Sequence, residues 1–174
     1  MTCPARVRTV AQVAKRGASA VGRLDDPRIT QWGVMVEAHS RVMARLQQDL
    51  QVECGLQPTW FEVLLRLVRS PGGQLRMSEL AAQVSFTSGG FTRLADRIEA
   101  AGLIERQPSA TDRRAALAVI TAEGRSVVER AAEVHLRGLQ AYVWDHLSPE
   151  QITTWEHAAR TVRDADATLA DRSE

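Results

Sequence analysis

The chain has 174 residues, the length of one domain or of one domain with added helices. Hydrophobic residues make up 44% of it and aromatic residues only 5%, so it can support a real core that is mostly aliphatic. The formal net charge is +1, so bulk charge gives no support for nucleic-acid binding, and any basic surface depends on where the arginines lie. No run approaches about eighteen consecutive apolar residues, which excludes a membrane span.

The first 26 residues are predicted to form a basic extension. Residues 1–24 contain arginines but no acidic residue, and they lack the apolar stretch of a secretory signal. A long helix should follow from about Pro27 to Val52, closed by Gly55, because apolar residues recur there at helical spacing. Those residues are Ile29, Trp32, Met35, Val36, Val42, Met43, Leu46 and Leu50.

A second helix is predicted to begin at Thr59 and to end near the run Ser70-Pro71-Gly72-Gly73. Thr59 and Glu62 have the spacing of a capping box, in which the two side chains bond to each other's backbone amides. The apolar face of this helix continues with Phe61, Leu64, Leu65 and Val68.

Two short helices joined by a tight turn are predicted next. The first begins at Glu79-Leu80-Ala81, the turn is Ser85-Phe86-Thr87, and Thr87 or Ser88 caps the second helix. Gly102 ends this second helix. Its apolar face holds Phe91, Leu94, Ala95 and Ile98, whereas Thr92, Arg93, Asp96 and Arg97 point elsewhere. Such a pair is a helix-turn-helix, whose second helix enters the major groove of DNA.

The second helix of the pair opens with small residues. Gly89 and Gly90 follow Ser88, although each glycine in a helix costs up to about 1 kcal/mol relative to alanine. Without side chains, the helix start can approach a surface closely, and its free amides suit a phosphate. The alternative interpretation is that the glycines only relieve crowding in the turn.

A β-hairpin is predicted after Gly102. Leu103-Ile104 and the run Ala115 to Ile120 are β-compatible, and the loop between them ends in Asp112-Arg113-Arg114. An arginine on such a loop can reach a minor groove, where narrow A·T-rich segments concentrate negative potential. The alternative is a solvated turn with a weak local ion pair. The helix-turn-helix directly upstream favours contact with DNA.

Together these residues resemble the MarR family of winged helix-turn-helix transcriptional regulators. The resemblance rests on Glu79-Leu80-Ala81, the run 87–106, and Asp112-Arg113-Arg114 with Leu117, Ile120-Thr121 and Gly124, and it spans roughly residues 29–169. The opening of the second helix most resembles the urate-responsive branch. The resemblance implies that Asp96 holds an arginine of the hairpin, the wing, in place. Arg76 departs from the family, which usually has a Ser or Thr helix cap there.

Two helices are predicted after the hairpin. Thr121 caps one that runs to about His146, with Val127, Val128, Ala131, Val134 and Leu139 on its apolar side. Ser148-Pro149-Glu150-Gln151 then has the features of a helix start, including a capping box. The last helix carries the stripe Ile152, Trp155, Ala159, Val162 and Leu169. The small helix-turn-helix cannot cover all these faces, so we expect a second copy of the chain to bury them, in a homodimer.

The sequence gives little support for an enzymatic, metal-binding or redox function. The four histidines, His39, His135, His146 and His157, are scattered, and no catalytic set or phosphate-binding loop is present, so neither an enzyme nor a cofactor is expected. Cys3 and Cys54 lie far apart without metal-ligand spacing, which favours a reduced, cytoplasmic protein. A metal site of His39, Cys54 and Glu62 has no supporting geometry. Cys54 is expected to be a structural thiol and not a redox switch.

The predicted fold is mainly α, a winged helix-turn-helix over about residues 57–121 between long dimerisation helices at about 27–54 and 122–170. Residues 27–174 would form this domain. The predicted function is sequence-specific binding of double-stranded DNA at a palindromic operator, as a repressor relieved by a small ligand. The alternative is a helical protein–protein adaptor that retains a winged helix without reading DNA. The predicted DNA contacts are Thr87, Ser88, Gly89, Gly90, Thr92, Arg93, Arg97, Asp112, Arg113 and Arg114.

A ligand pocket is expected from the resemblance alone, which implies a site for small aromatic or phenolic acids between the dimerisation helices and the DNA-reading part. Trp32, His39, Trp60, Glu62 and Arg66 lie on the helices that would line it. For Trp32 and Trp60 the alternative is a place in the core or an interface. For Glu62 the alternative is the capping box of its own helix.

Overall fold

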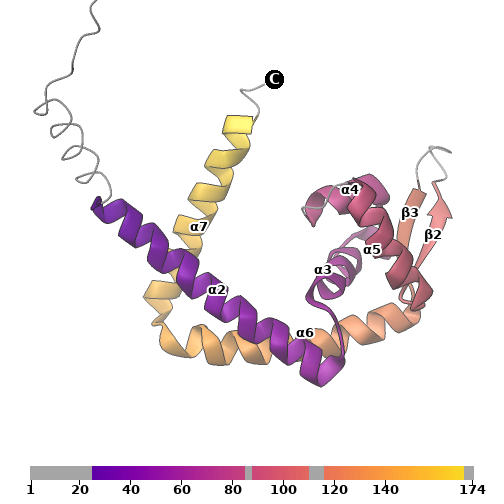
Figure 1. Ribbon diagram of the computed structural model, residues 1–174, viewed down its shortest axis with the longest axis horizontal. Coiled ribbons are helices and arrows are strands. Elements are labelled where there is room, and N and C mark those ends of the chain that lie inside the picture. Colours follow the sequence, from indigo (N-terminus) through magenta and orange to yellow (C-terminus); the bar gives the residue numbers. More distant parts are fainter. Residues whose placement is uncertain (1–24, 85–87, 110–115, 171–174) are drawn as a thin grey trace, which may run out of the picture. The chain divides into compact units, whose positions relative to one another are not determined.

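The computed structural model describes residues 25–84, 88–109 and 116–170. Backbone contacts divide the chain into two units, residues 1–43 and 44–174, which are described separately. The helices are α2 (Pro27–Cys54), α3 (Pro58–Val68), α4 (Met77–Gln83), α5 (Ser88–Ala100), α6 (Ala122–Tyr142) and α7 (Pro149–Ala170), and the strands are β1 (Gln74–Arg76), β2 (Ile104–Pro108) and β3 (Ala116–Ile120) (Figure 1). Short 3₁₀ turns lie at Pro71–Gly73 and Trp144–His146. The mainly α, winged-helix prediction is confirmed.

Helix α2 begins at Pro27 as predicted and ends at Cys54, two residues later than expected. Gly55 closes it with a φ of 62°, a left-handed conformation that glycine adopts without strain. Its amide donates to the Gln51 carbonyl at 3.1 Å, and the Leu56 amide donates to the Leu50 carbonyl at 3.3 Å. These bonds use carbonyls that the helix end would otherwise leave free.

The predicted capping box at the start of α3 is wrong. Helix α3 begins at Pro58, and its cap residue, Gln57, makes no side-chain cap bond. Proline fits the first helical position because its φ is already helical and it lacks the amide that would need a partner there. The helix therefore begins before Thr59, and Glu62 instead accepts a long hydrogen bond of 3.5 Å from Arg66.

The core of the second unit lies where α3, α4 and α5 meet the sheet and the first half of α6. It is mainly aliphatic, as the composition predicts, with two phenylalanines at its centre. Its buried members include Phe61, Leu64, Leu67, Leu80, Phe91, Leu94, Ile98, Ile104, Ala118 and Val128. In Figure 1 the short helices α4 and α5 lie beside the hairpin of β2 and β3.

The sheet has three antiparallel strands in the order β1-β3-β2. The predicted hairpin is confirmed: Ile104 pairs with Ile120 and Pro108 with Ala116, so β2 is longer than its apolar residues suggested. Strand β1 was not predicted. It has three residues and pairs Gln74 with Val119, and so short a strand carries no periodic signal of its own.

The end of α2 is joined closely to α6 within the second unit. A side chain on Gly138 would place its first carbon 2.5 Å from a methyl group of Leu46, so a larger residue at this approach of the two helices would require the Leu46 side chain to shift. The hydroxyl of Tyr142 donates to Asp49 at 2.9 Å, and Arg45 lies over the Tyr142 ring, 5.3 Å from its centre. Helix α6 ends at Tyr142, four residues before the predicted end, since Val143 leaves the helical conformation.

The capping box predicted for α7 is confirmed. The Ser148 amide donates to the Gln151 side chain at 2.8 Å, and the Gln151 amide donates to the Ser148 hydroxyl at 3.3 Å. The apolar stripe of α7 is largely uncovered in the single chain, because Trp155 and Val162 are both exposed. Among the described residues, no helix is long and apolar enough to cross a membrane.

Candidate nucleic-acid interface

Helix α5 has two distinct faces. Phe91, Leu94 and Ile98 are buried, as is Ala95, so the apolar face predicted from the sequence is confirmed. Thr92, Arg93, Asp96 and Arg97 are exposed on the other side. The helix stops at Ala100, and Gly102 follows with a φ of 74°. The second helix of the pair therefore presents a polar face to solvent along its length.

The two arginines on this face differ from most others in the structure. Within the described residues, Arg93 and Arg97 have no ion-pair partner. By contrast, exposed arginines on other helices pair with acids one turn away, such as Arg41 with Glu37 and Arg160 with Glu156, both at 2.6 Å. In the same segment Arg76 and Arg106 do pair with acids, at 3.9 and 2.6 Å, so among its described arginines Arg93 and Arg97 keep the more available charge.

Arg106 connects the wing to α5. From strand β2 it reaches Asp96 of α5 at 2.6 Å and donates to the Thr92 carbonyl at 3.2 Å. The Arg106 amide donates to the Glu99 side chain at 2.9 Å. The sequence suggested that Asp96 holds a wing arginine, and in the described part of the wing that arginine is Arg106.

We expect Arg106→Gln to destabilise the protein by about 1–2 kcal/mol and to weaken DNA binding about tenfold, because the wing strand loses its ionic contacts to α5. Urea unfolding and DNA titration measure the two effects. Arg130→Gln is the matched control, since Arg130 is exposed and its ion pair with Glu123 is long, at 4.0 Å. Such a pair contributes well under about 1 kcal/mol. Equal stability of the two variants would contradict the role of Arg106.

A second connection joins the end of α5 to the start of α6. The Thr121 hydroxyl donates to the Gly102 carbonyl at 2.8 Å and accepts from the Gly124 amide at 2.9 Å. The Thr121 amide also donates to the Leu103 carbonyl at 3.1 Å. Thr121 is thus the cap of α6, as predicted. It also connects α6 to the residue that follows the end of α5, a role that the sequence pattern did not reveal.

The small-residue start of α5 is placed in its first turn. Ser88, Gly89 and Gly90 are the first three residues of the helix, and both glycines are exposed. A side-chain carbon on Gly89 would meet no described atom within 4 Å. Relief of crowding by described atoms therefore does not explain Gly89. Thr87, Asp112, Arg113 and Arg114 lie outside the described residues, as does the predicted turn 85–87.

Helix α4 begins at Met77, two residues before the predicted start. Its cap residue is Arg76, which makes no side-chain cap bond and lies 3.9 Å from Glu79. The expected departure from a Ser or Thr cap is confirmed. The helix starts early because β1 ends at Arg76, and pairing with β3 sets that end.

The predicted ligand-pocket residues fall in both units. Trp32 and His39 are exposed on the first half of α2, whereas Trp60, Glu62 and Arg66 lie on α3 in the second unit. The indole nitrogen of Trp60 is buried, and no described atom accepts a hydrogen bond from it. Trp60 is therefore the one of the five with a buried, unused donor.

The buried environment of His135 was not predicted from the sequence. Its ring lies 5.0 Å from Phe61, and its Nδ1 is buried with no hydrogen-bond partner among the described residues. Burial lowers the pKa of His135, and the positive charge of Arg69 lowers it further. A lone histidine on α6 gave no pattern to find.

The described residues give no support for a metal site or for a redox switch. They contain no group of three or more His, Cys, Asp and Glu side chains placed to hold a metal ion. Cys54 is half-buried and packs against the core, as expected of a structural thiol. Cys3 lies outside the described residues.

Two short helices followed by an antiparallel hairpin that packs on the second helix define a winged helix-turn-helix protein. Residues 55–115 match the sequence profile of the MarR family. The chain is 26% identical to the HTH-type transcriptional regulator PrsX of Escherichia coli over 121 residues, 70% of this chain and 72% of PrsX. It is 27% identical to the multiple antibiotic resistance protein MarR of Salmonella typhimurium, over 68% of this chain and 81% of that protein.

Solved structures of MarR family regulators have a similar fold. AbsC, a MarR family transcriptional regulator from Streptomyces coelicolor, is 27% identical with a TM-score of 0.76, covering 82% of this chain and 96% of AbsC. Sco3205, a MarR family regulator from the same organism solved in complex with DNA, is 29% identical with a TM-score of 0.72, covering 78% of this chain and 85% of Sco3205. The winged helix-turn-helix of this chain, within residues 55–115, is therefore of the MarR type, and the proteins that the chain matches are transcriptional regulators and not enzymes.

Proposed function

We propose that this regulator binds double-stranded DNA in a sequence-specific way, with α5 in the major groove and the wing at the adjacent minor groove. The observation that carries the proposal is that Arg93 and Arg97, exposed on the polar face of α5, have no ion-pair partner among the described residues. Arginine offers parallel donors to guanine or to phosphate. The exposed glycines of the first turn would let backbone amides approach a phosphate.

The proposed active form is a homodimer on a palindromic operator. The single chain leaves Trp32, Trp155 and Val162 exposed, and burial of such apolar side chains drives association. A two-fold dimer presents two recognition helices, which suit half-sites about one helical turn apart. Bound over a promoter, such a dimer would act as a repressor.

The test is a titration of the purified protein against DNA flanking its own gene, at two salt concentrations. Specific binding that weakens with salt is expected, since each neutralised phosphate releases counterions. Binding to the flanking DNA no tighter than to random DNA would overturn the proposal and favour the protein–protein adaptor.

Relief of repression by a small aromatic or phenolic acid is the second part of the proposal. Trp60 supports it, because its indole nitrogen is buried with no hydrogen-bond acceptor among the described residues, and such a donor suits a planar ligand that carries an acceptor. Glu62 and Arg66 lie on the same helix, α3, and pair only loosely, at 3.5 Å. A ligand carboxylate could therefore recruit Arg66 at little cost.

A thermal-shift screen of phenolic acids should find compounds that raise the melting temperature and release DNA. We expect Trp60→Phe to lose most of this shift while the free protein stays at least as stable, because the variant keeps a ring and removes an unsatisfied donor. An acid that stabilises both proteins equally would place the ligand elsewhere. If no acid shifts the wild type, the effector class is wrong.

A further inference from the structure

The ring of His135 lies where α6, which carries it, packs against α3. Its centre is 5.0 Å from the centre of the Phe61 ring, and Phe61 belongs to the buried core. The Nδ1 atom of His135 is buried and has no hydrogen-bond partner among the described residues. A neutral imidazole leaves one nitrogen without a proton, whereas a charged ring carries a hydrogen on both nitrogens, and each then needs an acceptor. The interface therefore suits the neutral ring and not the charged one.

No acidic side chain one turn away on α6 could pair with a charged His135. The residues at that spacing are Ala131, Ala132, Gly138 and Leu139. Glu133 is two residues away and therefore lies on another side of the helix. Asp49 and Glu53, at the end of α2, already bind other side chains of α6. A protonated His135 would therefore gain no ion pair from these two helices in the described structure.

Helix α3 contributes a positive charge to this environment. Its acidic side chain, Glu62, accepts a hydrogen bond from Arg66. Burial lowers the pKa of His135, and the charge of Arg69, directly after α3, lowers it further. Protonation of His135 would thus add a second positive charge near Arg69 and beside a buried aromatic ring.

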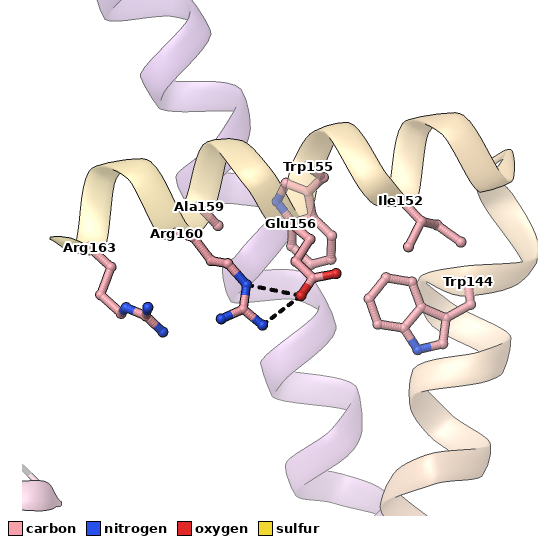
Figure 2. A pocket seen from close by; sticks show the side chains of 7 residues that line it. All are labelled: Trp144, Ile152, Trp155, Glu156, Ala159, Arg160 and Arg163. Atoms are coloured by element: carbon pink, nitrogen blue, oxygen red, sulfur yellow. Dashed lines mark hydrogen bonds and ion pairs between the residues drawn. The ribbon is translucent and has the colours of Figure 1, made fainter.

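Charged groups elsewhere in the structure have partners that His135 lacks. In the hollow beside α7, Glu156 accepts two hydrogen bonds from Arg160, at 3.0 and 2.6 Å, which Figure 2 shows as dashed lines. Within the described residues, no carboxylate forms an ion pair with His135. The other three histidines of the chain are all exposed, so water can solvate their charge. A proton on His135 would have neither water at Nδ1 nor a carboxylate.

Helix α6 connects this interface to the end of α5. At the start of α6, the Thr121 hydroxyl donates to the Gly102 carbonyl at 2.8 Å, and the Thr121 amide donates to the Leu103 carbonyl at 3.1 Å. Gly124 allows the helix to lie directly against that Leu103 carbonyl. A movement of α6 away from α3 would therefore disturb the segment that follows α5.

We propose that the α3–α6 interface is a pH-sensitive switch, in which protonation of His135 in mildly acidic solution loosens the packing of α6 on α3 and weakens DNA binding. The inference rests on the proposed function, because it concerns the affinity of the same protein for DNA. The packed interface holds the neutral ring, so protons bind the loosened form better. They shift the population toward it as the pH falls below about 6.5, the ordinary pKa of histidine.

The first test measures stability by urea unfolding at about pH 8 and about pH 5.5, at one protein concentration. Between these values the ratio of folded to unfolded wild type should fall about three- to tenfold more than that of His135→Gln, because only the unfolded chain binds this proton readily. His146→Gln, at an exposed histidine, is the matched control and should behave as the wild type. His135→Phe keeps a ring beside Phe61 without a titrating group and should match His135→Gln. Equal losses in the wild type and both His135 variants would overturn the proposal.

The second test follows the titration of His135 itself by NMR of the histidine ring protons. Arg69→Gln removes an exposed charge and should raise the pKa of His135 and reduce the stability lost at about pH 5.5. A histidine that only fills space would show neither change. A His135 that titrates like the exposed histidines, in the wild type and in Arg69→Gln alike, would overturn the proposal.

The third test measures DNA affinity at the same two pH values and at constant salt. Wild-type affinity should fall about three- to tenfold at about pH 5.5, whereas His135→Gln should keep or gain affinity. The gain is expected because protonation of exposed histidines adds positive charge and strengthens attraction to phosphates. An equal fall in both proteins would overturn the switch. No specific binding at either pH would overturn the proposed function, while the stability and NMR results would still support or contradict the role of His135.

Discussion

Gly124→Ala is expected to lower the free energy of unfolding by about 3 kcal/mol, although alanine normally favours a helix by up to about 1 kcal/mol. Gly124 lies in the first turn of α6, where an added carbon would overlap the carbonyl oxygen of Leu103 and lie 2.9 Å from Ile120. The Leu103 carbonyl is backbone and already accepts from Thr121, so it cannot move aside cheaply. The start of α6 would then have to move away from the segment that follows α5.

Gly89→Ala is the matched control, since Gly89 also lies in the first turn of a helix but an added carbon there would meet no atom of the described residues within 4 Å. Its stability should equal or exceed that of the wild type by up to about 1 kcal/mol. Urea unfolding followed by circular dichroism measures both variants. If Gly124→Ala is as stable as Gly89→Ala, the close approach of α6 to Leu103 is not required by the fold. A loss of DNA affinity in Gly89→Ala would support close contact of the helix start with DNA.

Arg93→Ala is expected to weaken operator binding about 10- to 100-fold and to flatten the sequence preference. A bidentate contact of arginine with guanine contributes about 1–3 kcal/mol of discrimination, and Arg93 is exposed one turn into α5 with no ion pair to give up among the described residues. Selection of bound sequences from randomised operators measures the preference. Because Arg93 is exposed and is not a member of the buried core cluster, thermal stability should not change.

Two other arginine variants separate base reading from general charge. Arg113→Ala and Arg114→Ala should lower affinity evenly across sequences and reduce the salt slope by about one unit, as loss of a phosphate contact does. Arg130→Ala, on α6, should leave binding unchanged. If the Arg93→Ala variant selects the same sequences as the wild type, Arg93 only positions the helix on phosphate. The base-reading residue would then lie elsewhere on α5.

Features that depend on local periodicity and on the special preferences of single residues could be predicted from the amino-acid sequence. The buried face of α5, its end before Gly102 and the capping box at Ser148 were all predicted correctly. Each follows from residues a few positions apart, because a helix places residues three and four apart on one side and its ends need specific partners. The exposed arginines of α5 were found in the same way.

Features that depend on residues far apart in the chain could not be predicted from local patterns and are known only from the tertiary structure. Strand β1 exists because β3 pairs with it, and the partner of Asp96 is Arg106 because β2 lies along α5. The need for glycine at position 124 arises from a carbonyl on a different element. The predicted start of α3 was wrong because the helix begins at Pro58, one residue before the expected cap Thr59. Local patterns define the faces and ends of helices, but contacts between elements choose among the partners that each face and each charge could take.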